Sequence, residues 1–226
     1  MPASAARVVF RACHGVIAVL VVVALVVDVS VTVAGGPAFV AVDGSPLGLG
    51  GRLANLFSYF TILSNVLVLV TSAVFALRPE PSGALFRVLH LDALLSIAAT
   101  GVVYAVLLAA TEHPTGWSVL SNTIFHDVVP VAFPLVWLVF GPRPRLTWRL
   151  VGLAFVWPVL WLTYTFVRGA VTGWYPYGFL NARQLGFVGA LLGALQVFVS
   201  AVVLAVVITL LDARLPALGR NRSTAR

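Results

Sequence analysis

Lysine is absent from this sequence of 226 residues, and all 14 of its cationic side chains are arginine. Retinal and pyridoxal phosphate are held by a Schiff base to a lysine amine. The sequence therefore excludes both of these cofactor-dependent classes, including a rhodopsin-like function for a compact helical bundle.

Charged residues of any kind are scarce, at 9% of the chain, whereas 61% of the residues are hydrophobic. This profile is typical of a polytopic membrane protein. A spanning helix needs about 20 mostly apolar residues, and six stretches meet this requirement. We predict an all-α fold, a single domain over residues 1–226 with a basic tail at 212–226 and six transmembrane helices at about residues 8–34, 55–77, 89–111, 122–140, 149–170 and 186–211.

The first stretch also resembles a secretory signal, since Arg7 and Arg11 precede it and small residues follow at 34–36. Its apolar run is longer than the roughly 7 to 15 residues of a signal core, and five more spans follow. We therefore expect a retained first helix, while cleavage would leave five spans. Cys13 is the only cysteine and can form no internal disulfide.

The arginines predict the orientation of the bundle. Cytoplasmic loops of membrane proteins carry an excess of basic residues. The termini and the second and fourth loops hold 11 arginines, against three on the opposite side at Arg52, Arg168 and Arg183. Both termini are therefore predicted to be cytoplasmic.

The net charge of +7 lies in short loops and tails, which favours lipid headgroups over nucleic acid as its partner. The loops on the predicted outer side are longer and richer in glycine and aromatic residues, which suggests that the working end faces outward. We expect a multi-pass integral protein of a bacterial cell membrane. Its oligomeric state is left open.

Polar residues inside spanning segments are costly and usually face the bundle interior, so each one is a functional candidate. Ser58, Thr61 and Asn65 are spaced to share one face of the second span, with Thr61 roughly 9 Å below its outer edge. Asn122 and His126 share a face of the fourth span, with His126 roughly 6 Å down. Four helices bring polar groups to this layer, the first through Asp28 and the fifth through Tyr164, Thr165 and Arg168.

Pro130 adds a local feature beside His126. Its ring lacks an N–H donor and clashes with the carbonyl four residues earlier, which belongs to His126. We therefore expect the fourth helix to be kinked at the histidine. By contrast, His14, His90 and Asp92 are expected near cytoplasmic helix ends, in interfacial or capping positions.

A hydroxyl beside a neutral histidine in a partly desolvated pocket can begin acyl transfer from an ester. Thr61 is the candidate nucleophile, and His126, the only histidine at that depth, is the candidate base. Supporting roles fall to Asn65 and Asn122 as oxyanion donors and to Asp28, ahead of Asp127, as the partner of the imidazole. Ser64 and Tyr164 complete the set of candidate supporting residues.

Other interpretations stay open at this point. Hydroxyl residues at helix interfaces often serve packing and interhelical hydrogen bonding alone. The same polar layer also suits a small transporter or lipid-binding protein, although only Ser96, Thr100, Tyr104 and Gln196 continue it toward the cytoplasmic side. One histidine with scattered carboxylates does not make a closed metal site, so neither a metal nor another cofactor is expected.

Two motifs, "FSYFTILSN" at 57–65 and "SNTIFHDVVP" at 121–130, resemble those of a bacterial branch of six-span membrane proteins distantly similar to the androgen-induced protein family. Animal members of that family are membrane threonine hydrolases that cleave fatty acid esters of hydroxy fatty acids. The resemblance implies a lipid ester or fatty acyl ester substrate, with Thr61 as nucleophile and His126 as base.

Overall fold

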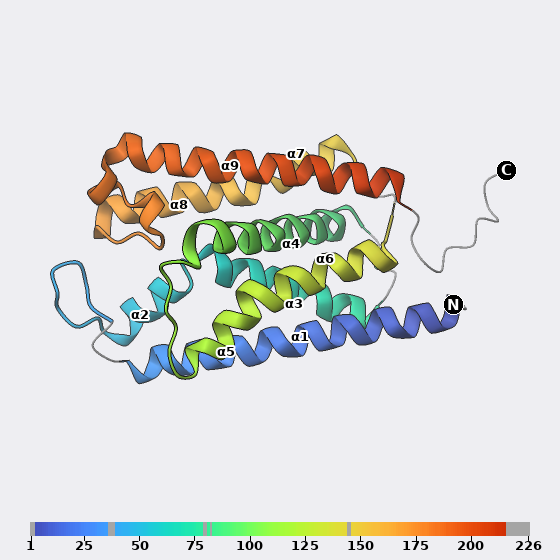
Figure 1. The fold of residues 1–226 in the computed structure, drawn as a ribbon, viewed down its shortest axis with the longest axis horizontal. Helices are drawn as coiled ribbons and strands as arrows, with labels where there is room; N and C mark the ends of the chain where they lie inside the picture. The colour runs from blue at the N-terminus through green and yellow to red at the C-terminus, as the bar shows by residue number, and fades with distance from the viewer. Residues whose placement is uncertain (1–2, 36–38, 79–80, 82, 144–145, 216–226) are drawn as a thin grey trace.

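The computed structural model describes residues 3–35, 39–78, 81, 83–143 and 146–215. Throughout these residues the chain is helical or irregular, and six helices are long and apolar enough to cross a membrane. Figure 1 shows them aligned along one long axis. The prediction of an all-α bundle with six apolar helices is confirmed. Most of the predicted basic tail, from residue 216 onward, lies outside the described residues.

Some of the six helices are uninterrupted and others consist of several elements. The continuous ones are α1 (Ala3–Ala34) and α3 (Phe60–Leu77), whereas α9 (Ala182–Arg214) is kinked at Gly186, where φ is 70° and ψ is 162°. The third spanning helix joins α4 (Ala84–Val103) to a π-helical turn, η1 (Tyr104–Leu108); the fourth joins α5 (Ser118–Thr123), a π-helical turn η2 (Ile124–Val128) and α6 (Val129–Phe140); and the fifth joins α7 (Trp148–Ala154) to α8 (Val156–Thr172). The short α2 (Leu49–Leu56) and η3 (Gly178–Leu180) lie outside the six.

α4 occupies the centre of the bundle. It packs against α3, α6, α7 and α9, and Figure 1 shows it between the α8–α9 layer and the layer of α1, α3 and α6. Its apolar stretch is half buried inside the protein, whereas those of α1 and α9 are 22% buried. α1 and α9 therefore present most of their surface to lipid.

The predicted start of the second span at residue 55 is wrong. α2 ends at Leu56, and α3 begins only at Phe60 after an extended Tyr59 with φ −69° and ψ 130°. The intervening Ser58 carbonyl instead accepts a hydrogen bond from the indole Nε1 of Trp161, at 3.0 Å. This interhelical bond replaces a helical one, so a hydropathy pattern that runs smoothly through 55–77 does not reveal the break.

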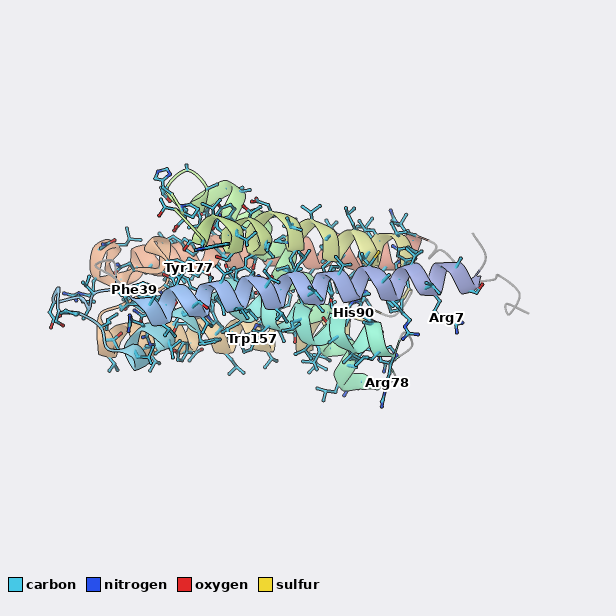
Figure 2. The ribbon with its side chains drawn as sticks, turned by 90° about the horizontal axis from the view of Figure 1, so that it is seen from below. Arg7, Phe39, Arg78, His90, Trp157 and Tyr177 are labelled. Atoms are coloured by element: carbon cyan, nitrogen blue, oxygen red, sulfur yellow. The ribbon has the colours of Figure 1, made fainter. Side chains whose placement is uncertain are left out.

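The two ends of the bundle differ in composition. α1 begins and α9 ends at the same end (Figure 1), which agrees with an even number of spans. Figure 2 shows Arg7 and Arg78 at this end, and Tyr177 and Phe39 toward the opposite one. The arginine-rich end is the one predicted to face the cytoplasm.

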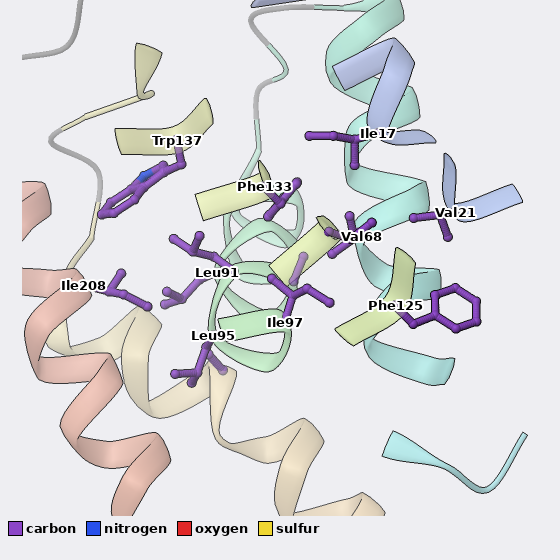
Figure 3. Packing of buried hydrophobic residues seen from close by; sticks show 14 of the residues in the cluster. Ile17, Val21, Val68, Leu91, Leu95, Ile97, Phe125, Phe133, Trp137 and Ile208 are labelled. Atoms are coloured by element: carbon purple, nitrogen blue, oxygen red, sulfur yellow. The ribbon is translucent and has the colours of Figure 1, made fainter. Parts of the chain in front are cut away.

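The apolar core lies where α4 meets α3 and α6. Figure 3 shows its buried side chains converging from separate helices, among them Val68, Ile97 and Phe133. Lipid is as apolar as these side chains, so close packing rather than exclusion from water stabilises such a core. This core packs the part of α3 that follows Thr61 against α4 and α6.

The prediction of interfacial positions for His14, His90 and Asp92 is wrong. Their exposed fractions are only 2%, 9% and 6%. α1 and α4 begin at Ala3 and Ala84, so all three side chains lie more than a turn inside their helices. Both imidazoles pack among aromatic rings, with Phe75 in contact with each.

Candidate active site

Thr61 is the second residue of α3, not a residue in the middle of a helix. The first backbone N–H groups of a helix have no partner within it and carry the positive end of the helix dipole. The predicted face shared by Ser58, Thr61 and Asn65 is therefore wrong for Ser58, which precedes the helix. The structure nevertheless buries the Thr61 side chain to 7% exposure.

His126 lies in the π-helical turn η2, where the Val129 N–H donates to the carbonyl of Ile124, five residues back. Pro130 has no N–H to give to the His126 carbonyl, so the irregularity expected at the histidine is present as this wide turn. Single π-helical turns are frequent at functional sites. The turn directs the imidazole of His126 toward the start of α3.

The side chains of Thr61, at the start of α3, and His126, in η2, are in contact. The distance from Thr61 Oγ1 to His126 Nε2 is 3.3 Å. This is close to the hydrogen-bonding range of a nucleophile and its base, a contact that is often looser before substrate binds. Two residues separated by 65 positions and chosen from sequence are thus brought into contact.

The other ring nitrogen determines the direction of this contact. His126 Nδ1 lies 3.2 Å from the backbone carbonyl oxygen of Asn122, which can only accept a hydrogen bond. A neutral imidazole must therefore carry its proton on Nδ1, which leaves Nε2 as an acceptor facing the Thr61 hydroxyl. This is the tautomer that a general base requires.

Tyr177 completes the hydrogen-bonded chain and was not among the residues predicted from sequence. Its hydroxyl accepts from the Thr61 backbone N–H at 3.2 Å and lies 3.3 Å from Thr61 Oγ1. Since the Thr61 hydroxyl proton points to His126, the Tyr177 hydroxyl is left to donate to Thr61 Oγ1. The aromatic content of the loop at 173–181 was the only sequence signal for this residue.

Burial raises the pKa of Tyr177, and its hydrogen bonds with the Thr61 side chain and backbone only partly offset this effect. A raised pKa favours the neutral phenol over the phenolate. Tyr177 therefore keeps its proton, and with it the ability to donate, throughout the neutral and mildly alkaline range.

The loop that carries Tyr177 is fixed against α8 and α9 by two close approaches at glycine. A Cβ atom at Gly193 would lie 2.2 Å from the carbonyl oxygen of Phe179, and one at Gly169 would lie 2.1 Å from the ring of Tyr175. The guanidinium of Arg168 also lies over the ring of Trp174, at 4.7 Å. The loop can lie this close to α8 and α9 because positions 169 and 193 are glycine; a larger residue at either position would displace it.

Asn122 and Tyr104 support His126 from the side. The ring of Tyr104 stacks on the imidazole with centroids 4.1 Å apart, and the Asn122 amide Nδ2 donates to the Tyr104 hydroxyl at 2.8 Å. Asn122 was predicted to be an oxyanion donor, but its side-chain amide donates to the Tyr104 hydroxyl. It is the backbone carbonyl of Asn122 that orients His126.

The hydrogen bonds of the remaining candidates go to groups other than Thr61 Oγ1 and the His126 ring. Asn65 donates to the Thr61 and Phe125 carbonyls, and Ser64 donates to the carbonyl of Phe60, so both hold backbone. Tyr164 pairs with Ser58. The predicted orienting role of Asp28 is wrong, because the Asn122 carbonyl takes the Nδ1 proton and Asp28 accepts from Ser121; Asp127 is exposed.

Two cavities meet at Thr61, Tyr177 and Leu108, which line both of them. The larger, here called the polar cavity, has a volume of about 440 Å³ and is also lined by His126, Asp28 and Glu112. The smaller, here called the apolar slot, has a volume of about 60 Å³ and runs between α4, α8 and α9. A molecule with one polar and one apolar part would therefore place its junction at Thr61.

Among the described residues, no group of three or more histidine, cysteine and acidic side chains is suited to hold a metal ion. No protein-family model, curated protein or solved structure matches the chain. Arguments about function therefore rest on the geometry of the Thr61 site and on the two sequence motifs.

Proposed function

We propose that this protein is an integral membrane hydrolase of lipid esters, such as fatty acid esters of hydroxy fatty acids, with Thr61 as nucleophile and His126 as general base. The observation that carries the proposal is the directed chain from the Asn122 carbonyl through His126 to the Thr61 hydroxyl. It leaves the nitrogen that faces the hydroxyl free to accept its proton.

In the acylation step, Thr61 Oγ1 forms a bond to the ester carbonyl carbon while its proton moves to His126 Nε2. The carbonyl oxygen becomes an oxyanion. When the intermediate collapses, the bond to the leaving oxygen breaks, and Nε2 returns the proton to that oxygen. The products of this step are an alcohol and an acyl ester of Thr61.

Water then attacks the acyl carbon with His126 again taking the proton, and Thr61 leaves with that proton as the fatty acid is released. The oxyanion of both steps would form at the start of α3. The Thr61 backbone N–H donates to the Tyr177 oxygen in the structure, and the Tyr177 hydroxyl donates to Thr61 Oγ1. These two donors would turn to the oxyanion as it forms, and the dipole of α3 would add to their effect.

The two cavities fit an ester whose carbonyl lies at their junction. The apolar slot, at about 60 Å³, would enclose only part of the acyl chain, and the polar cavity, at about 440 Å³, would take the alcohol portion and the attacking water. Both cavities reach Thr61, so neither part of the substrate has to cross the apolar core below.

The proposal is tested with purified protein and a fluorogenic fatty acyl ester. Removing a nucleophile or its base from an acyl-transfer site costs several orders of magnitude in rate. We expect Thr61→Ala and His126→Ala each to reduce turnover at least about 100-fold without loss of thermal stability. A fluorophosphonate should label Thr61 in the parent protein and label His126→Ala far more slowly. Equal turnover in the parent and in either variant would refute the assignment.

A second candidate function is the binding or transport of an amphipathic ligand. Its support is the stripe of Asp92, Ser96 and Thr100 on α4, whose buried side chains each have an oxygen without a hydrogen-bond partner among the described residues. Gln196, however, is exposed on α9 and does not extend this stripe. Ligand uptake by vesicles that survives Thr61→Ala unchanged, with no ester turnover in the parent, would favour this alternative.

A further inference from the structure

The apolar slot contains two hydroxyl groups that the protein itself does not use. Ser96 and Thr100 line the slot with 2% and 5% of their surface exposed, and neither hydroxyl has a hydrogen-bond partner among the described residues. They are four residues apart on α4 and so lie on one face, separated by about 6 Å along the helix axis. A buried hydroxyl without a partner is unfavourable.

Several other hydroxyl residues of the spanning helices donate within their own helix. Ser64, Thr71, Thr163 and Ser200 each donate to the carbonyl four residues earlier in their own helix. This is the usual way for serine and threonine to be accommodated in an apolar helix. Ser96 and Thr100 depart from this pattern, as Thr165 of α8 does, and of these three residues they are the two that line the slot.

The facing walls of the slot are apolar. Pro158 of α8 and Phe198 and Ala201 of α9 line it opposite α4. An ion would need polar groups from several sides to replace its hydration shell, whereas a hydrocarbon chain needs only an apolar tube. Polar groups on one wall alone suit a chain that carries an occasional polar substituent.

We propose that the apolar slot binds an acyl chain that bears a mid-chain hydroxyl group, and that Ser96 and Thr100 are the residues that recognise it. Each hydroxyl is able both to donate to and to accept from the substituent. The inference rests on the proposed function, because it is Thr61 that places the acyl carbonyl at the entrance of the slot.

The position of the substituent follows from the geometry of α4. Tyr104, one turn beyond Thr100, stacks on His126 and marks the level of the reaction. Thr100 and Ser96 therefore lie about 6 and 12 Å from that level along the helix. An extended chain advances about 1.2 Å per bond, so the hydroxyl is expected roughly five to ten bonds from the ester carbonyl.

Binding is measured in the Thr61→Ala variant, which keeps the slot and removes turnover. A fluorescent fatty acid is displaced by tetradecanoic acid, by its 6-hydroxy and 11-hydroxy derivatives, and by its 2-hydroxy derivative. We expect the mid-chain hydroxy acids to bind about three- to tenfold more tightly than the unsubstituted acid, as one additional hydrogen bond allows. The 2-hydroxy acid should show no such gain.

Adding Ser96→Ala and Thr100→Val should abolish this preference, whereas Thr163→Val, which removes an exposed hydroxyl of α8, should leave it unchanged. If the mid-chain hydroxy acids bind no more tightly than tetradecanoic acid, the inference is overturned, whether or not the parent hydrolyses esters. If the parent hydrolyses no acyl ester while the preference is present, the proposed function fails and recognition of the hydroxylated chain stands.

Discussion

At the scale of single residues, the site depends on which atoms donate and which accept. A backbone carbonyl cannot donate, so the contact between Asn122 and His126 Nδ1 determines the tautomer of the whole ring. No substitution of the Asn122 side chain would remove this acceptor. Tyr177 is different, because its contribution resides in one hydroxyl group that phenylalanine lacks.

Tyr177→Phe removes the donor to Thr61 and to the developing oxyanion, and retains the ring. We expect the kcat for ester hydrolysis to fall about 10- to 100-fold, as for the loss of one oxyanion donor, with little change in KM. Steady-state rates measured over a range of fluorogenic ester concentrations give kcat and KM for the two proteins. An unchanged kcat would exclude Tyr177 from the reaction.

The raised pKa of Tyr177 has a predicted consequence for pH dependence. Because burial disfavours the phenolate, the hydroxyl should still donate at a pH near the ordinary tyrosine pKa of about 10. The ratio of the parent kcat to that of Tyr177→Phe should therefore stay constant between about pH 7 and 10. A ratio that falls toward one across this range would show that Tyr177 ionises normally.

At the scale of elements, two helix irregularities create the site. The break before α3 places Thr61 in the first turn of that helix, with its N–H on the Tyr177 oxygen, and His126 lies in the π-helical turn η2. α4 contributes by its closeness to α6, since a Cβ atom at Gly101 would lie 2.7 Å from Pro130 Cβ. The site is thus assembled where regular helices end.

The loop carrying Tyr177 offers a test of this arrangement away from the reacting atoms. Gly193→Ala would introduce a methyl group 2.2 Å from the carbonyl oxygen of Phe179 and so displace η3. A small misplacement of a catalytic donor can cost up to about 100-fold in rate. We expect lower kcat and a slightly reduced Tm in thermal unfolding of the detergent-solubilised protein.

The matched control is Gly152→Ala in α7, where an added Cβ atom would meet nothing within 4 Å. This variant should keep the parent kcat and Tm. Equal activity of the two alanine variants would mean that the position of η3 does not matter for turnover.

At the scale of the whole molecule, the bundle separates an arginine-rich end from an end that contains the site. Arg7 and Arg78 lie at one end, and Tyr177 lies toward the other (Figure 2). The positive-inside rule assigns the arginine-rich end to the cytoplasm. The Thr61 site would then open toward the outer leaflet.

This orientation is testable by labelling, because Cys13 is the only native cysteine. In a Cys13→Ala background, Val42→Cys and Arg78→Cys place exposed thiols at opposite ends of the bundle. A membrane-impermeant maleimide applied to intact cells should label Val42→Cys and should label Arg78→Cys only after permeabilisation. The reverse pattern would contradict the predicted orientation.

Much of the bundle could be predicted from the sequence because hydropathy is a property of local stretches. Six apolar runs of spanning length imply six helices, since a backbone in lipid must satisfy its own hydrogen bonds. The pairing of Thr61 with His126 was also predictable, because few polar groups occur in these helices and each tends to face the interior. The burial of His14 and His90 was not, because Phe75 and Phe133, which contact both rings, come from other helices.

The sequence by itself thus determined the number of spanning helices, their apolar character and the two residues that meet in the candidate site. Only the tertiary structure decided that α3 begins at Phe60, that Asn122 orients His126 through its backbone, and that Tyr177 reaches Thr61. The start of α3 and the position of Tyr177 depend on contacts between segments distant in sequence, such as Trp161 with Ser58, whereas the Asn122 contact lies within one helix and depends on how the His126 ring is turned. Local pattern contains no information about such contacts, because their energies arise only when the helices pack.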